Sequence, residues 1–171
     1  MGKIGALRRP EYTMTSRPLV ELLDRSSSAL VLWARNWCRT PEDVVQVAFC
    51  KLAALRVWPE DPLAWLYKVV RHGAVDAGKA ERRRRHREER VARAECWFHE
   101  ATVDGVDAEH LTQQLQGLPV EQREAIVMKL WGGLTYEQMA LAVGSSVSTM
   151  HRRYEAGISG LRERLGEPCT S

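Results

Sequence analysis

The sequence predicts an all-α protein in which two small helical domains are joined by a linker. No segment of the 171 residues alternates apolar and polar side chains with the period of two that marks a half-buried strand. Apolar residues instead recur at intervals of three or four, as on one face of a helix. Hydrophobic residues make up 44% of the chain, which is enough to bury a core, so a folded helical protein is expected.

The first domain is expected over residues 18–93 and should hold three helices. Residues 1–17 show no sustained period, and we expect them to be loosely ordered. The first helix should follow Pro18 and carry apolar residues as far as Trp37, with an interruption near the serines at 26–28.

Two prolines mark the starts of the next helices. Thr40 is expected to cap the second helix, and Pro41 occupies its first position, where the missing N–H removes no hydrogen bond. Asp61-Pro62 repeats this arrangement. The third helix should therefore begin there and continue through an arginine-rich run towards Arg93.

Residues 94–108 are expected to be a linker, because they are acidic and lose the helical period. The second domain should span residues 109–166 and hold four helices, with a short tail over residues 167–171. Its first two helices are expected over residues 109–117 and 118–131.

The last two predicted helices form a helix-turn-helix over residues 135–165. Thr135 and Gln138 have the spacing of a capping box, in which each side chain binds a backbone N–H at the helix start. Gly144 is placed to end that helix in the left-handed conformation, and Ser146 to cap the next one. Small polar residues followed by arginines at the start of a second helix are typical of side chains presented to the DNA major groove. A helical hairpin with a solvated basic face is the alternative interpretation.

Charge is unevenly distributed along the chain, although the total is only +3. Between Arg71 and Arg93, nine lysines and arginines accompany four acidic residues, whereas between Ala94 and Glu124 seven acidic residues accompany one arginine. This segregation indicates a basic surface for a polyanion beside an acidic connector.

The residues that serve metal sites and catalysis are scattered. The four cysteines are Cys38, Cys50, Cys96 and Cys169. They form no CxxC pair and have no histidine at ligand spacing, so we expect reduced thiols, no metal and no cofactor. Glu88-Glu89 lacks a matching histidine or aspartate constellation, so an enzyme is not expected. No apolar run approaches the ~20 residues that cross a bilayer, and we expect a cytoplasmic protein without membrane insertion.

Two groups of motifs, one in each half, resemble the same family in the same order. Residues 43–49 (DVVQVAF) look like a D-x-x-Q-x-x-F helix, and residues 65–72 (WLYKVVRH) look like W-L-x-x-I-A-x-N. Residues 118–123 (LPVEQR), 133–140 (GLTYEQMA) and 148–153 (STMHRR) are similar to L-P-x-E-Q-R, G-L-S-x-E-E-I-A and G-T-V-x-x-R. The family is that of bacterial RNA polymerase sigma factors of the small extracytoplasmic-function type, which retain only regions two and four.

The resemblance implies a transcription initiation factor that binds core RNA polymerase and directs it to a two-part promoter. The first domain would dock on polymerase and melt the minus-ten element of the promoter DNA, and the second would bind the minus-thirty-five element. An anti-sigma factor or another protein regulator is a further implied partner. A helix-turn-helix regulator that never engages polymerase stays open, although it would have no need for the motif at residues 43–49.

The resemblance also assigns residues to each role. The polymerase-binding residues would be Asp43, Gln46 and Phe49, of which Phe49 is alternatively a core residue. The minus-ten residues would be Arg71, His72, Asp76, Lys79, Arg82 and Arg83, with His72 standing where the family usually has asparagine. The minus-thirty-five residues would be Ser148, Thr149, His151, Arg152 and Arg153. Of these, Arg152 is the candidate base reader, and Arg153 is expected to hold the helix against backbone phosphate.

Overall fold

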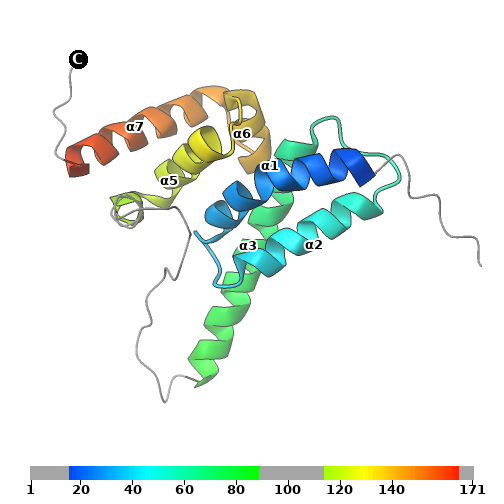
Figure 1. The fold of residues 1–171 in the computed structure, drawn as a ribbon. Coiled ribbons are helices and arrows are strands. Elements are labelled where there is room, and N and C mark those ends of the chain that lie inside the picture. The colour runs from blue at the N-terminus through cyan, green and yellow to red at the C-terminus, as the bar shows by residue number, and fades with distance from the viewer. Residues whose placement is uncertain (1–15, 89–113, 166–171) are drawn as a thin grey trace, which may run out of the picture.

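A computed structural model describes residues 16–88 and 114–165, and every regular element in these two ranges is helical (Figure 1). A single helical turn at residues 114–116 precedes the second group of helices. The elements are α1 (Ser16–Ala34), α2 (Pro41–Ala54), α3 (Pro62–Glu88), α5 (Val120–Ile126), η1 (Val127–Trp131), α6 (Tyr136–Val143) and α7 (Val147–Leu165). The all-α prediction is therefore confirmed for the described part of the chain. The predicted linker and C-terminal tail lie outside it, as do most of the N-terminal residues.

Helix α1 differs from its prediction at three points. It begins at Ser16, before Pro18, and continues without interruption through the serines at 26–28. Ser26 fits inside the helix because its hydroxyl donates to the Leu22 carbonyl oxygen one turn earlier, at 2.5 Å. The helix ends at Ala34, so the chain already turns before Trp37.

The starts of α2 and α3 use different caps. The prediction that the Thr40 side chain caps α2 was wrong, because Thr40 has φ −117° and ψ 59° and its side chain makes no capping hydrogen bond. Asp61 does cap α3, since its Oδ1 accepts from the Ala64 N–H at 2.9 Å. The described part of α3 ends at Glu88, so the predicted extension to Arg93 lies outside the described residues.

From residue 118 onward the second half follows its predicted helix boundaries closely, whereas residues 109–113 of its first predicted helix lie outside the described residues. Helix α5 begins after Pro119 and continues into η1, a turn of π-helix that the sequence did not predict, in which the Gly132 N–H donates to the Val127 carbonyl at 3.0 Å. The capping box of α6 is confirmed, with Thr135 and Gln138 bonded reciprocally.

The turn between α6 and α7 is also confirmed. Gly144 has the left-handed φ of 70° that a residue with a Cβ adopts only at a cost in strain. Ser146 caps α7 by accepting from the Thr149 N–H at 3.1 Å.

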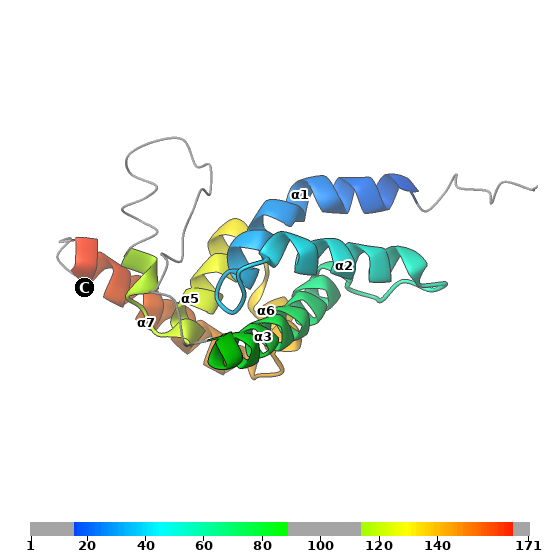
Figure 2. The same ribbon diagram turned by 90° about the horizontal axis from the view of Figure 1, so that it is seen from below.

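The two halves share one hydrophobic core, a point that the sequence left open. Trp33 and Tyr67 from the first half belong to the same buried cluster as Met128, Leu134 and Met139 from the second. Helix α3 packs against α6 and α1 packs against η1, so the second half lies alongside α1 to α3 in both views (Figures 1 and 2). We call this packing the closed arrangement.

Candidate nucleic-acid interface

Helix α7, the predicted recognition helix, is held by a small aromatic cluster at its junction with α6. The Tyr136 ring lies 5.0 Å from the His151 ring and 6.1 Å from the Tyr154 ring, measured between centroids. Met150, on the same helix, is buried in the shared core. These contacts hold one face of α7 inward and leave the opposite face at its N-terminal end in solvent.

The predicted minus-thirty-five residues divide by what their side chains already bind. The hydroxyls of Ser148 and Thr149 lie 3.1 and 2.7 Å from the Ser146 hydroxyl, so both belong to the cap of α7. His151 is exposed and lies 3.6 Å from the Glu155 carboxylate. These three side chains must give up or share an existing contact in order to bind DNA.

Arg152 and Arg153 differ in exposure. Arg152 is exposed and takes part in none of the hydrogen bonds or ion pairs found among the described residues. Arg153 is half-buried, and its positive charge opposes the rise in the pKa of the Glu124 carboxyl that burial causes. Of these two arginines, Arg152 is therefore the one whose guanidinium is more available to a base edge.

Glycines bring α7 close to α5, and the sequence analysis did not anticipate this role. A Cβ at Gly157 would lie 2.9 Å from Ile126 Cδ1 and 3.2 Å from Gln122 Cβ. A Cβ at Gly160 would lie 3.0 Å from Leu118 Cδ2. The G-x-x-G spacing on a predicted helix was the signal that could have identified this close contact.

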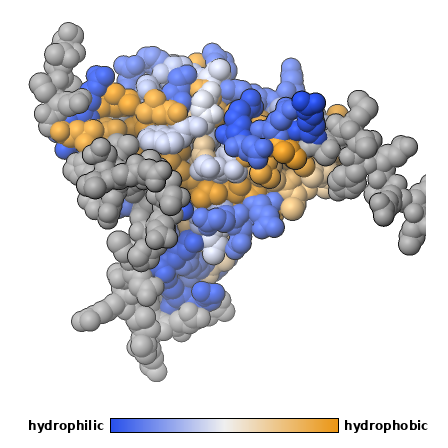
Figure 3. All heavy atoms as spheres, viewed as in Figure 1, coloured by the Kyte–Doolittle hydropathy of each residue, from blue (hydrophilic) through white to orange (hydrophobic). Residues whose placement is uncertain are grey.

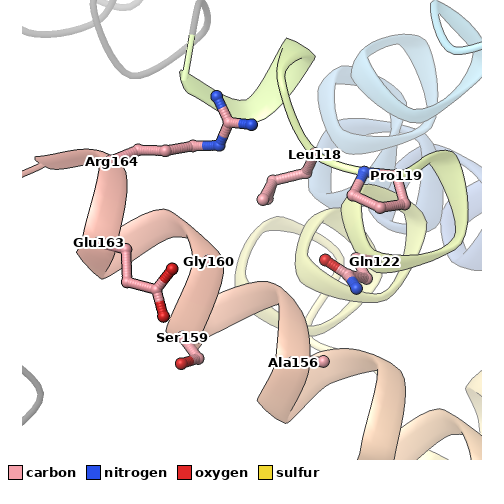
Figure 4. A pocket seen from close by; sticks show the side chains of 8 residues that line it. All are labelled: Leu118, Pro119, Gln122, Ala156, Ser159, Gly160, Glu163 and Arg164. Carbon is pink, nitrogen blue, oxygen red and sulfur yellow. The ribbon is translucent and has the colours of Figure 1, made fainter.

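A groove of about 560 Å³ lies beside the C-terminal half of α7 (Figure 4). Leu118, Pro119 and Gln122 form one wall, and the α7 residues Ser159 and Glu163 lie on the other. Arg164 closes one end by donating to the Gly117 carbonyl at 2.7 Å. The groove lies further along α7 than the recognition residues and shares none of them.

Most of the predicted minus-ten residues form one exposed stripe along α3. His72, Asp76, Lys79 and Arg83 are all exposed and recur at the three- and four-residue spacing of a helix face. Arg82 is exposed beside them. Figure 3 shows this end of α3 as a hydrophilic surface.

Arg71 does not belong to this stripe. Its Nε donates to Glu124 Oε1 at 3.0 Å, and its guanidinium lies 5.6 Å from the centroid of the Trp37 ring. Glu124 is almost fully buried, so desolvation raises the pKa of its carboxyl, and the hydrogen bond and charge of Arg71 oppose that rise. In the closed arrangement Arg71, a predicted DNA contact, is thus bonded to Glu124 in the other half of the chain.

The predicted polymerase-binding residues are brought only partly together. Asp43 and Gln46 are exposed on α2, whereas Phe49 is 5% exposed and belongs to the core. Gln46 and Phe49 do line one groove of about 410 Å³ between α1 and α2, whose wall also includes Leu23 from α1. Phe49 therefore contributes an edge of this groove and not a projecting side chain.

Within residues 16–88 and 114–165, no group of three or more histidine, cysteine, aspartate or glutamate side chains is arranged to hold a metal ion. None of the described helices combines the length and apolar composition of a membrane span.

Sequence comparison relates the chain to known transcription proteins. Residues 108–158 match the family described as "Sigma-70, region 4". The chain is 30% identical over 109 residues to the "ECF RNA polymerase sigma factor SigK" of Mycobacterium ulcerans, a match that covers 61% of this chain and 58% of the relative. The SigK of Mycobacterium bovis is 28% identical over 108 residues, with 60% and 58% covered. The chain thus spans little more than half the length of the curated relatives it matches.

Two solved structures share the fold over most of the chain. The sigma factor RpoE of Bartonella quintana, crystallised with the anti-sigma factor NepR, aligns with a TM-score of 0.70 at 23% identity over 87% of this chain and 94% of RpoE. CnrH, in complex with the cytosolic domain of CnrY, aligns with a TM-score of 0.61 at 22% identity over 88% of each chain. Over 61% of its length the chain is therefore similar in sequence to an extracytoplasmic-function (ECF) RNA polymerase sigma factor, and its residues 108–158 match the sigma-70 region 4 family.

Proposed function

We propose that this protein is a non-enzymatic transcription initiation factor that binds core RNA polymerase and directs it to a two-part promoter. The observation that carries the proposal is the recognition helix α7, which keeps Arg152 exposed on a capped helix-turn-helix within the segment that matches sigma-70 region 4. A guanidinium in this position can bind guanine with two hydrogen bonds and so discriminate between base pairs.

The exposed stripe of α3 supports a second DNA contact in the first half. Lys79, Arg82 and Arg83 supply positive charge to phosphates, which makes binding strongly dependent on salt concentration. His72 and Asp76 on the same stripe offer hydrogen-bonding groups to unstacked bases. We assign this stripe to the minus-ten element and to the stabilisation of melted DNA.

The α1–α2 groove supports docking on polymerase. Its accessible surface is almost entirely apolar, and Ser27, Glu42 and Gln46 are the polar residues among those that line it. Asp43 lies one turn before Gln46 on the exposed side of α2. An apolar groove with a polar rim suits a protein partner, since apolar burial provides affinity and polar groups fix orientation.

A protein regulator of the anti-sigma type is a further proposed partner. The structural relative RpoE was crystallised with an anti-sigma factor, and the closed arrangement of this chain matches that fold over most of its length. The groove beside α7 is the candidate surface for such a partner (Figure 4).

Reconstituted transcription tests the proposal. The purified protein and core RNA polymerase should produce discrete run-off transcripts from a genomic promoter library, and core polymerase alone should not. Co-purification with core polymerase separates this function from that of a regulator that binds DNA alone. Binding to DNA without any binding to polymerase would contradict the proposed function.

A further inference from the structure

One polar junction joins the starts of two helices from opposite halves of the chain. Asp61 Oδ1 caps α3 through the Ala64 N–H, and its Oδ2 accepts from the Gln138 side-chain amide at 2.8 Å. The Gln138 amide oxygen accepts in turn from the Thr135 N–H at 2.9 Å, which closes the capping box of α6. We call Asp61, Gln138 and Thr135 the cap junction.

The cap junction requires an amide at position 138. A capping box accepts glutamate or glutamine at this position, because either supplies the oxygen that binds the backbone N–H. Only glutamine also has an N–H group to donate to Asp61. Glutamate would keep α6 capped and place a second carboxylate against the first, so the choice of glutamine connects the two halves.

The apolar part of the contact next to this junction contains an unsatisfied group. Tyr67 is fully buried, and a Cβ added to Gly132 of the other half would meet its hydroxyl. That hydroxyl has no hydrogen-bond partner within the described residues. A buried unpaired hydroxyl opposes closure, because it regains hydrogen bonds with water when the halves separate. The hydrogen bonds of the cap junction therefore contribute more to closure than they would if the Tyr67 hydroxyl were paired.

Closure has unequal effects on the two surfaces of the first half. Arg71 is bound to Glu124, whose side chain is 1% exposed, so Arg71 cannot turn to DNA while the halves are packed together. Asp43 and Gln46 stay exposed, and the α1–α2 groove is lined by residues of the first half alone. A closed chain can thus present its docking groove while it withholds Arg71.

We propose that the cap junction acts as an intramolecular switch, in which the hydrogen bond from Gln138 to Asp61 keeps the free chain closed with Arg71 withheld and the docking groove open. That closure withholds a DNA contact rests on the proposed function of Arg71. Closure of the free chain does not depend on that function. Opening breaks the bond between Gln138 and Asp61, the Arg71–Glu124 pair and the contacts of the shared core, and it leaves both helix caps intact.

A polarity exchange between two side chains tests the switch. Gln138→Glu keeps the capping box and adds a negative charge where the α6 dipole favours one, so any opening cannot come from a weaker helix. Asp61→Asn keeps an oxygen for the Ala64 N–H and turns an N–H group towards Gln138. The double variant Asp61→Asn/Gln138→Glu restores one donor facing one acceptor with both caps retained.

The measurement is the distance between the halves in the full-length free protein. Dyes are attached at Val57→Cys and Leu141→Cys, which replace exposed residues of the first and second halves, in a chain whose four native cysteines are changed to alanine. Single-molecule energy transfer then gives the ratio of open to closed molecules. Small-angle X-ray scattering of the unlabelled variants gives an independent measure of expansion.

We expect each single variant to raise the open-to-closed ratio at least ~tenfold, because a hydrogen bond to a charged group is lost. In the double variant this ratio should return towards that of the parent. Equal ratios in all four proteins, or a double variant at least as open as the single ones, would overturn the proposal. The transcription assay is scored separately. If the four proteins show the expected open-to-closed ratios but the parent yields no transcript, the switch is supported and the proposed function is contradicted.

Discussion

Helices α3 and α7 both carry the cations that we propose contact DNA, but the fold holds the two helices in different ways. The first half of α3 is surrounded by α1, α2 and α6, and only its later turns project as an exposed hydrophilic end (Figures 1 and 3). Helix α7 packs against α5 and α6 and keeps the face with His151 and Arg152 near its N-terminal end exposed. Arg71 on α3 is bound across the shared core, whereas Arg152 on α7 is not. The availability of a cation therefore depends on its distance from the core as much as on its motif.

Glycine substitutions should show this difference most strongly. A Cβ at Gly78 of α3 would meet the backbone carbonyl oxygen of Trp37, which cannot rotate away. We expect Gly78→Ala to lower the free energy of unfolding by about 3 kcal/mol, at the upper end for overpacking. Urea denaturation followed by circular dichroism measures the change.

Gly157→Ala on α7 is the matched control. The nearest atom to its Cβ would be the flexible end of Ile126, at 2.9 Å, and alanine also favours the helix by ~1 kcal/mol. We expect a net loss below about 1 kcal/mol. An equal loss for both variants would show that α7 is packed as rigidly as α3.

Loss of the Arg71 side chain should have the next largest effect. Arg71→Ala leaves the Glu124 carboxylate buried without its partner, a change that costs ~3 to 5 kcal/mol for a fully buried pair. The Arg71 side chain is 32% exposed, so we expect about 2 to 3 kcal/mol after screening by solvent. Urea denaturation at pH 7 measures it.

Glu124→Gln serves as the control, because its amide oxygen can still accept from Arg71. We expect this variant to be more stable than Arg71→Ala. The reverse order would mean that the buried carboxylate is stabilised by groups other than Arg71.

Local features of the fold could be read from the sequence, and contacts between distant segments could not. The capping box of Thr135 and Gln138 and the left-handed Gly144 follow from rules that involve a few consecutive residues. The Arg71–Glu124 pair joins residues 53 positions apart, and no local pattern encodes such a contact.

The wrong predictions have similar causes. Thr40 has the residue type of a cap, but the turn after α1 gives it a φ of −117° and a ψ of 59°, outside the extended region of a usual cap residue, and its side chain makes no capping hydrogen bond. The serines at 26–28 lower helix propensity, yet tertiary packing of α1 outweighs that weak preference. The exposed residues of the candidate site were predictable from helical periodicity, whereas the burial of Phe49 and Arg71 depended on which helices pack over them.

Arg152→Ala should leave the fold unchanged and alter DNA recognition. The side chain is exposed, so we expect less than about 0.5 kcal/mol change in stability. Loss of a bidentate contact should reduce discrimination at one base pair of the upstream element by ~1 to 3 kcal/mol. Selection of bound sequences from a randomised library measures it. A loss of affinity that is uniform across sequences would assign Arg152 to a phosphate.

The smallest expected effect is a pH dependence that arises at Glu124. Burial raises the pKa of this carboxyl above its ordinary value, so the folded chain binds the proton more tightly than the unfolded chain does. The contribution of Glu124 to stability is therefore fully present below the unfolded pKa and is lost as the pH rises through the folded pKa.

The difference in unfolding free energy between the parent and Glu124→Gln isolates this contribution, because both proteins share every other titrating group. Urea denaturation of both proteins at several pH values from 4 to 8 should show the parent losing stability relative to Glu124→Gln as the pH rises. A relative gain with rising pH would instead mean that the ion pair with Arg71 outweighs desolvation, and would place the pKa of Glu124 below its ordinary value.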